Sequence, residues 1–220
     1  MVKKLSETHN LAHQFFSDQR KILDLIKRDT PGSGFEAAVV RLVGNKPEQG
    51  KTVRIGTHEF RYSNYENNRL SFLPAQWQNE LDKTEGTRSG CENWWAGYPL
   101  IAWVGIRANN DGTTGYLTLN AEVGPVSNHA VRKRLIEAIR MAAFATGLER
   151  IHFPVVATQK GRLYSRFLRE NSIAVSDIRN TDEIEKKCAE LIAGFKLEFE
   201  CVASVIPQFV NSGASTSLRR

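Results

Sequence analysis

Residues 98–125, YPLIAWVGIRANNDGTTGYLTLNAEVGP, predict a long antiparallel hairpin at the centre of the fold. Residues 98–106 are almost continuously apolar, as a central strand is, and the Asn-Asn-Asp-Gly sequence at 109–112 is a strong hairpin turn. Residues 115–123 then alternate, so that successive side chains face opposite sides of the sheet. The set expected to face the core is Leu117, Leu119, Ala121 and Val123, and the set on the other face is Tyr116, Thr118, Asn120 and Glu122.

Further strands and a short helix are expected upstream of this hairpin. Runs at 51–55, 59–63 and 70–73 are β-like and are separated by turn residues, which predicts a small meander followed by a helix at 75–83. Residues 35–43 are apolar, but their period does not distinguish helix from strand. Downstream, residues 151–157 suggest a further strand, and 160–170 a loop or a short helix.

A helix should follow the hairpin directly. Gly124-Pro125 ends the second strand, Ser127 or Asn128 can cap a helix, and Gly147 is a natural stop. The expected buried stripe of this helix is Val131, Leu135, Ile139 and Ala142. The residues left on its exposed side are then Arg132, Lys133, Arg134 and Arg140.

The ends of the chain complete the predicted organisation. A helix from Ser6 to about residue 28 forms an N-terminal arm (1–30), and one α+β domain spans 31–206. A long amphipathic helix opens near Thr181 and ends at Pro207, and the Ser/Gly/Thr-rich tail at 207–220 is expected to be disordered. The predicted fold class is α+β: an antiparallel sheet or meander with an N-terminal helix, a helix after the central hairpin and a long C-terminal helix.

Composition places the chain among globular proteins. Of 220 residues, 41% are hydrophobic and 25% charged, and no apolar run approaches the roughly 18 residues of a membrane span. The first residues lack the apolar region of a secretory signal. Three widely spaced cysteines, Cys91, Cys188 and Cys201, are typical of reduced thiols. We therefore expect a cytoplasmic protein without disulfides and without a membrane segment.

Positive charge is concentrated in one part of the chain. The formal net charge is +6, and residues 131–170 hold nine basic residues against three acidic ones, which leaves the remainder neutral with 21 of each sign. The nine are Arg132, Lys133, Arg134, Arg140, Arg150, Lys160, Arg162, Arg166 and Arg169. Such a concentration is typical of a surface that binds a polyanion, although an ordinary solvated helix face gives the same pattern.

No complete catalytic motif is present. The sequence lacks a Walker A loop, a GxGxxG fingerprint and a GxSxG elbow, and its cysteines form no CxxC pair. A metal-dependent nuclease needs neighbouring carboxylates and a lysine; Glu122 with Asp111 is the nearest candidate, but Gly124 stands where the lysine is needed. We predict no catalytic residues, no cofactor and no metal site.

Aromatic residues gather around the start of the central strand. Trp94, Trp95 and Trp103 could stack on unpaired bases, as aromatic side chains do in single-strand binders. They lie outside the basic segment, however, and packing in the core is the simpler role for them.

From Tyr116 onward the sequence resembles a known family. The relevant residues are LNAEVGP at 119–125, Arg132 and Leu135 in the following helix, KGRLYS at 160–165, and Asp177 with DEI at 182–184 before a final helix. They are similar to the C-terminal accessory region of a bacterial group of PD-(D/E)XK nuclease superfamily proteins, which is associated with restriction and phage defence. The nuclease half of that family has no counterpart here, so the resemblance implies an accessory module and carries over no catalytic residue.

These observations predict a non-catalytic nucleic-acid-binding module that acts in the conflict between bacteria and phages, with DNA preferred as ligand. The residues expected to contact phosphates are Arg132, Arg134, Arg140, Lys160, Arg162 and Arg166. The first alternative is an inhibitor or adaptor, encoded by a phage for example, that docks its basic face on an acidic protein surface or a host nucleic-acid enzyme. The second is a degenerate PD-(D/E)XK-type nuclease.

Glu122 has an orienting role in this prediction. It follows the polar side of its strand and stands just before the turn into the basic helix. On an uncovered face its carboxylate would be solvated. We expect instead that it forms an ion pair with Arg132 or Arg162 and so orients the basic segment.

Overall fold

The computed structural model describes residues 34–83, 89–95 and 97–214, with side chains described as far as Pro207. These residues belong to one compact unit, 34–220, of the two into which the chain divides. The predicted N-terminal helix at 6–28 lies outside the described residues, as do residues 215–220 of the predicted tail.

An antiparallel sheet forms the centre of the described unit. Its strands are β1 (Thr52–Ile55), β2 (His58–Glu66), β3 (Arg69–Pro74), β4 (Leu100–Ala108), β5 (Gly115–Val123), β6 (Ser165–Arg166) and β7 (Ser172–Val175). They are ordered β1-β2-β3-β4-β5-β6, and β7 also pairs with β5. The predicted hairpin is confirmed as β4–β5, the longest pairing in the sheet. Because β6 pairs with the end of β5 and β7 with its start, the chain after β5 returns along one edge.

Five α-helices accompany the sheet in the described residues, which confirms the α+β class. They are α2 (Phe35–Val43), α3 (Ala75–Leu81), α4 (His129–Thr146), α5 (Thr181–Gly194) and α6 (Lys196–Ala214). Asn128 caps α4, its Oδ1 accepting from the backbone N–H of Ala130 and Val131, and Gly147 ends it with a left-handed φ of 69°. No helix in this set combines the length and hydrophobicity that crossing a membrane requires.

The predicted single C-terminal helix is wrong in two respects. The helix breaks at Phe195, where Arg150 Nη2 donates to the carbonyl of Gly194 and so satisfies an acceptor that the break leaves free. The second helix, α6, then continues through Pro207 to Ala214. Proline removes one hydrogen bond inside a helix and bends it without necessarily ending it.

The predicted strand at 151–157 is also wrong. Ile151 forms one isolated bridge to Leu168, and Val155–Thr158 is a 3₁₀ helix. Pro154 stands between them and has no N–H to donate to a ladder, so a strand cannot pass through it in the middle of a sheet.

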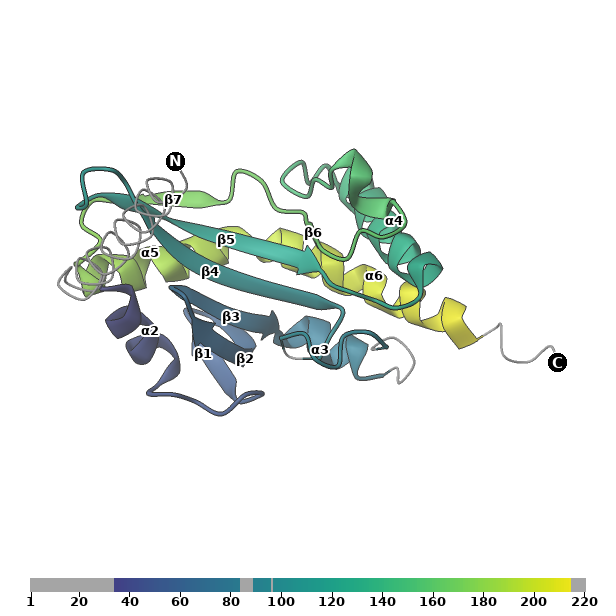
Figure 1. Cartoon of the computed structure of the whole chain (residues 1–220), viewed down its shortest axis with the longest axis horizontal. Helices are drawn as coiled ribbons and strands as arrows, with labels where there is room; N and C mark the ends of the chain where they lie inside the picture. The colour runs from purple at the N-terminus through teal and green to yellow at the C-terminus, as the bar shows by residue number, and fades with distance from the viewer. Residues whose placement is uncertain (1–33, 84–88, 96, 215–220) are drawn as a thin grey trace, which may run out of the picture. The chain divides into compact units, whose positions relative to one another are not determined.

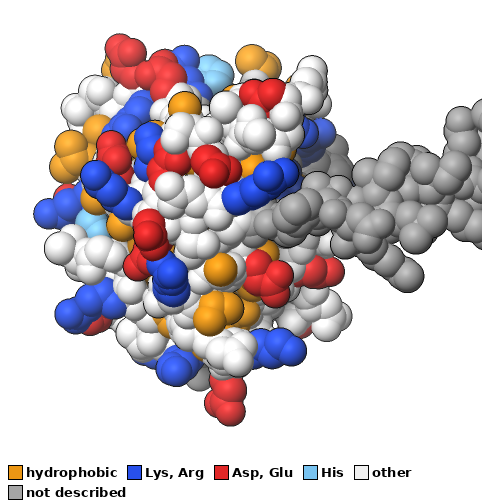
Figure 2. Space-filling model, turned by 90° about the vertical axis from the view of Figure 1, so that its left-hand side faces the viewer, with side chains coloured by type: hydrophobic (Ala, Val, Ile, Leu, Met, Phe, Trp, Pro, Cys, Tyr) orange, Lys and Arg blue, Asp and Glu red, His pale blue; other side chains and the backbone are white. Residues whose placement is uncertain are grey.

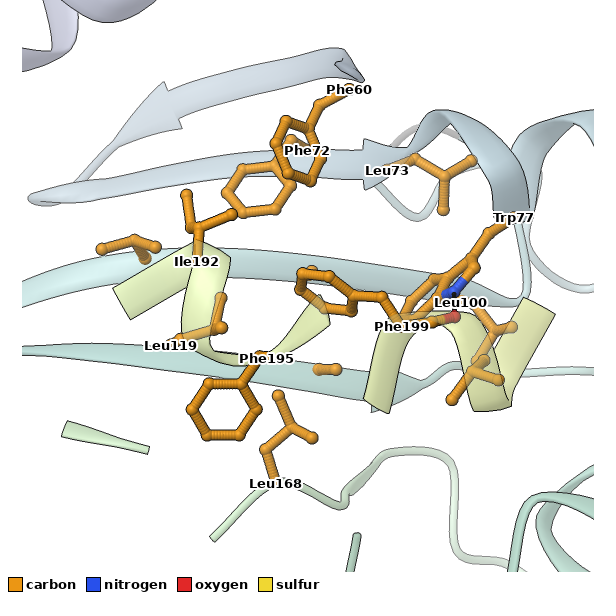
Figure 3. Packing of buried hydrophobic residues seen from close by; sticks show 14 of the residues in the cluster. Phe60, Phe72, Leu73, Trp77, Leu100, Leu119, Leu168, Ile192, Phe195 and Phe199 are labelled. Carbon is orange, nitrogen blue, oxygen red and sulfur yellow. Dashed lines mark hydrogen bonds between the residues drawn. The ribbon is translucent and has the colours of Figure 1, made fainter. Parts of the chain in front are cut away.

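The main core lies between one face of the sheet and helices α5 and α6, which run along it in Figure 1. The predicted inward set of β5 is confirmed, because Leu117, Leu119, Ala121 and Val123 are fully buried. Figure 3 shows Phe199 of α6 beside Trp77, whose Nε1 donates to the Phe199 carbonyl at 2.8 Å. The ring of Phe60 packs against Phe72 with centroids 4.6 Å apart.

No described helix packs on the other face of the sheet, which residues 91–95 cover in part. Trp94 and Trp103 are buried there, in a second small cluster with Ile101. Gly124 permits this cover, because a Cβ at that position would lie 2.2 Å from the Trp94 ring. The packing role predicted for these tryptophans is thus confirmed, although in a cluster separate from the main core.

Candidate nucleic-acid interface on the open sheet face

Arg132 is not on the exposed side of α4, as predicted, but 2% exposed. Its Nε donates to the carbonyl of Gly124 (3.0 Å), Nη1 to that of Ala157 (2.8 Å), and Nη2 to Ser165 Oγ (2.8 Å). Burial, and then the charge of Arg162, lower the pKa of Arg132. Arg132 therefore ties together the end of β5, the 3₁₀ helix and β6, and it cannot contact a phosphate.

The other five predicted contact residues are exposed, but they divide between two places. Arg134 and Arg140 lie on the outer face of α4, and Lys160, Arg162 and Arg166 lie on the segment that returns to β5. Of the five, Arg162 and Arg166 line a common pocket. Two of these five residues of the basic segment therefore share a hollow, and no α4 residue lines it.

Two further arginines, Arg69 and Arg107, lie on the open face of the sheet and were not singled out from the sequence. Arg69 is opposite Gly105 on β4, whose missing side chain leaves room for the Arg69 stem, and Arg107 is opposite Tyr116 on β5. Both arginines are exposed. Strand alternation could have placed Arg107 on this face, whereas Arg69 required the β3–β4 register.

These side chains line a series of three adjoining hollows, which together we call the sheet groove. Its principal residues are Arg69, Trp103, Arg107, Tyr116, Asn120 and Arg166. It consists of hollows of about 640, 600 and 580 Å³, of which the first two share Arg107 and Tyr116 and the last two share Arg166. The groove therefore follows the polar side of β5 from the hairpin turn to β6.

The groove combines positive charge with aromatic surface. The guanidinium of Arg166 lies 5.1 Å from the centroid of the Trp103 ring, and the Tyr116 side chain is 40% exposed. Among the described residues, no acidic one lines the middle hollow. Arginines can hold phosphates and the exposed ring of Tyr116 can stack on a base, so the groove has the chemistry that an unpaired strand requires.

Asp111, at the hairpin end, is occupied by its own turn. Its carboxylate accepts from the N–H groups of Thr113 and Thr114 and from the Thr114 hydroxyl, and these bonds, the Thr114 hydroxyl first, lower its pKa to about 2. Asp111 precedes the start of β5, whereas Glu122 lies near the end of that strand. They therefore do not form the carboxylate pair of a nuclease site.

Glu122 lies at the other end of the groove, and its predicted ion pair is wrong. It is 9% exposed, and no basic nitrogen of the described residues lies within 4.0 Å of its carboxylate. The donors of Arg132 are directed instead at backbone carbonyls and Ser165. Burial raises the pKa of Glu122, opposed by the charges of Arg166, Arg132, Arg69 and Arg162.

The three cysteines are buried, and none lies in the groove. Burial raises the pKa of the Cys91 thiol to about 11 and that of Cys188 to about 12, and it also raises the pKa of Cys201. The thiolate is the nucleophilic form, so these groups should be inert near neutral pH.

We accordingly expect Ellman's reagent at pH 8 to leave the native protein unlabelled for many minutes and to react at once with all three thiols in urea. The time course of absorbance measures both rates. A thiol that reacts in the native state as fast as in urea would contradict the buried positions.

The end of the unit formed by α2 and α5 offers no comparable basic surface. Figure 2, which views the left-hand side of Figure 1, shows basic and acidic side chains interspersed. Arg41 of α2 forms ion pairs with Asp182 and Glu185 of α5, and Lys187 pairs with Glu183 at 3.9 Å. The charges on this side are therefore largely compensated.

Among the described residues, fold and site together define an antiparallel α+β unit with one sheet face covered by helices and an arginine-lined face that no described helix covers. Comparison of the chain with protein-family models, curated proteins and solved structures finds no match in any of the three. The resemblance to a PD-(D/E)XK accessory region accordingly stays a prediction.

Proposed function

We propose that the chain binds single-stranded nucleic acid along the sheet groove and acts through binding, without chemistry of its own. One observation carries the proposal: three exposed arginines, Arg69, Arg107 and Arg166, line a hollow together with the exposed ring of Tyr116, on a sheet face that no described helix covers. Binding by aromatic stacking tolerates any base sequence, and arginine contacts to phosphates supply affinity.

The shape of the site favours an unpaired strand over a duplex. Duplex readers insert a helix or a β-ribbon into the major groove, whereas no residue of α4 lines the sheet groove. From Tyr116 to Glu122 the groove follows β5 for about 20 Å, at about 3.3 Å per residue. That length is adequate for a short site of about four nucleotides, at the lower end of single-strand binding modules.

The test is fluorescence anisotropy with a labelled 12-nucleotide dT strand, its RNA counterpart and a duplex, each at several salt concentrations. With three phosphate contacts the logarithm of affinity should fall with the logarithm of salt at a slope of about −2, since each single-strand contact contributes about −0.7. The single strands should bind more tightly than the duplex. No binding at low salt, or an affinity that salt does not change, would overturn the proposal.

Two matched triple variants locate the site. Arg69→Ala, Arg107→Ala and Arg166→Ala together should weaken single-strand binding by roughly 1,000-fold, because each charged hydrogen bond is worth about 1.5 kcal/mol and about 1.4 kcal/mol is tenfold in affinity. Lys133→Ala, Arg134→Ala and Arg140→Ala together remove the same charge from α4, none of whose residues lines the groove, and should leave affinity within about threefold. An equal loss in both variants would place binding on the basic segment instead.

A protein-binding adaptor is the second candidate, favoured by the outer face of α4. Phe144 is 90% and Met141 71% exposed there, on the same helix as Arg134 and Arg140. Apolar side chains among bases suit an acidic, amphipathic partner segment. Phe144→Ser should abolish such an interaction in a nuclease-treated pull-down and should not change binding to the dT strand.

The wider role rests on the family resemblance. Action in the conflict between bacteria and phages, in defence or in counter-defence, stays a prediction, as does a cytoplasmic location. A nucleic-acid-binding module without catalysis is compatible with a role in defence and with a role in counter-defence.

A further inference from the structure

The hollow at the β6 end of the sheet groove has a composition different from the rest, and we call it the terminal pocket. It has a volume of about 580 Å³, within the range of small-ligand sites, and is lined by Glu122, Arg162, Tyr164, Ser165 and Arg166 among others. It is the one of the three hollows to which a buried carboxylate contributes. Arg166 lines both this pocket and the middle hollow, so the two adjoin. A strand bound in the groove would therefore extend into the terminal pocket.

The Glu122 carboxylate has no structural partner. No hydrogen bond or ion pair joins it to another described residue, although its side chain is 9% exposed. Among the described residues, the fully buried side-chain oxygens without a hydrogen-bond partner are those of Ser63 and Ser71. The Glu122 oxygens are not among them, so they keep some contact with solvent. Its acceptors are therefore directed at the pocket and available to a ligand that donates hydrogen bonds.

Folding does not account for this carboxylate. Burial raises its pKa more than Arg166, Arg132, Arg69 and Arg162 lower it, so the ionised form is less stable in the fold than in water. Residues that violate local preferences in this way are expected at functional sites. A ligand with donors facing Glu122 would supply the missing partners.

We infer that the terminal pocket binds an unpaired guanine base, with the Glu122 carboxylate accepting hydrogen bonds from N1–H and the N2 amino group, and Arg162 or Arg166 donating to O6 or N7. The inference rests on the proposed function, since the base arrives as part of a strand in the sheet groove. Tyr164, with its side chain 45% exposed, offers a ring on which the base can stack.

The other bases fit this arrangement less well. Guanine presents two adjacent donors on its Watson–Crick edge, which match the two oxygens of a carboxylate, and its O6 and N7 are the preferred acceptors of arginine. Adenine and cytosine each place a ring nitrogen acceptor beside a single amino group, and that acceptor repels a carboxylate. In thymine and uracil the only ring donor is flanked by two carbonyls.

The experiment compares 12-nucleotide dT strands that differ at one central position, which is T, G, A or hypoxanthine. The G strand should bind about tenfold to hundredfold more tightly than the all-T strand, the discrimination expected of one bidentate contact. Hypoxanthine lacks the N2 amino group and should lose most of this gain, and adenine should show none. Equal affinities for the G and all-T strands would overturn the inference and leave the proposed function intact.

Glu122→Gln separates base recognition from strand binding. The glutamine amide has one acceptor oxygen in place of two and cannot accept from both N1–H and the N2 amino group, so the preference for G should disappear while the affinity for the all-T strand stays within about twofold. Persistence of the preference in this variant would remove Glu122 from recognition. Failure of every strand to bind the wild-type protein would instead overturn the proposed function and, with it, this inference.

Stability provides the control for this variant. A carboxyl whose folded pKa is raised destabilises the fold above that pKa, and this effect vanishes as pH falls below the ordinary value of 4.5. Glu122→Gln should therefore melt no lower than the wild type at pH 7, and its advantage should shrink toward pH 4. A lower melting temperature at pH 7 would reveal a structural role for Glu122 and overturn the inference.

Free guanosine monophosphate distinguishes a base in a strand from a nucleotide. As a competitor it should displace the G strand only at concentrations far above the dissociation constant of the strand, because the groove contacts are absent. If the mononucleotide binds as tightly as the strand, the pocket is a nucleotide site separate from the groove, and the inference is wrong.

Discussion

Replacing Arg132 with methionine should lower the free energy of unfolding by about 3 kcal/mol or more. The substitution removes the guanidinium donors to the carbonyls of Gly124 and Ala157 and to the Ser165 hydroxyl, and a hydrogen bond from a charged group contributes roughly 1.5–3 kcal/mol. Methionine restores much of the volume, so the loss reflects hydrogen bonds rather than a cavity. Urea denaturation followed by circular dichroism measures it.

Arg134→Met is the matched control for this prediction. It makes the same chemical change two residues further along the same helix, at an exposed position, and should alter stability by no more than about 0.5 kcal/mol. If the two variants were equally stable, the hydrogen bonds of Arg132 would not stabilise the contact between the end of β5, the 3₁₀ helix and β6.

Replacing Glu198 with glutamine should destabilise the protein by about 2–4 kcal/mol. Glu198 is 2% exposed and binds Arg150 through both carboxylate oxygens, to Nε and to Nη2, at 2.8 Å each. Removing one partner of a buried pair typically costs about 3–5 kcal/mol, and we lower the expectation because the Arg150 side chain is 32% exposed. Glutamine cannot accept two such bonds from a guanidinium.

The consequence extends to the break between α5 and α6. Arg150 also donates to the Gly194 carbonyl at 2.6 Å and lies 4.0 Å from the centroid of the Phe195 ring, so Glu198 holds the group that stabilises the break. Glu200→Gln, at an exposed position paired with Lys196 at 3.7 Å, is the control and should change stability by less than about 0.5 kcal/mol. Equal unfolding midpoints for the two variants would contradict this role.

Where local interactions decide the structure, the sequence predicts it well. The β4–β5 hairpin depends on the turn at 109–112 and on strict alternation in 115–123, and α4 depends on Asn128 and Gly147 at its ends. All of these determinants act between residues a few positions apart. They are present in the unfolded chain and favour the same conformation before any tertiary contact forms.

The candidate site depends on contacts between distant segments. Arg69, Arg107 and Arg166 share the groove because of the register between β3, β4 and β5 and the return of the chain to β6, which local patterns do not encode. The burial of Arg132 could not be predicted from helical periodicity alone, since its hydrogen-bond acceptors lie 8, 25 and 33 residues away. Phe195 could end α5 because Arg150, 44 residues from Gly194, supplies the missing donor. A buried polar group requires a partner wherever the chain can bring one, so its environment follows from the assembled fold and not from its neighbours in sequence.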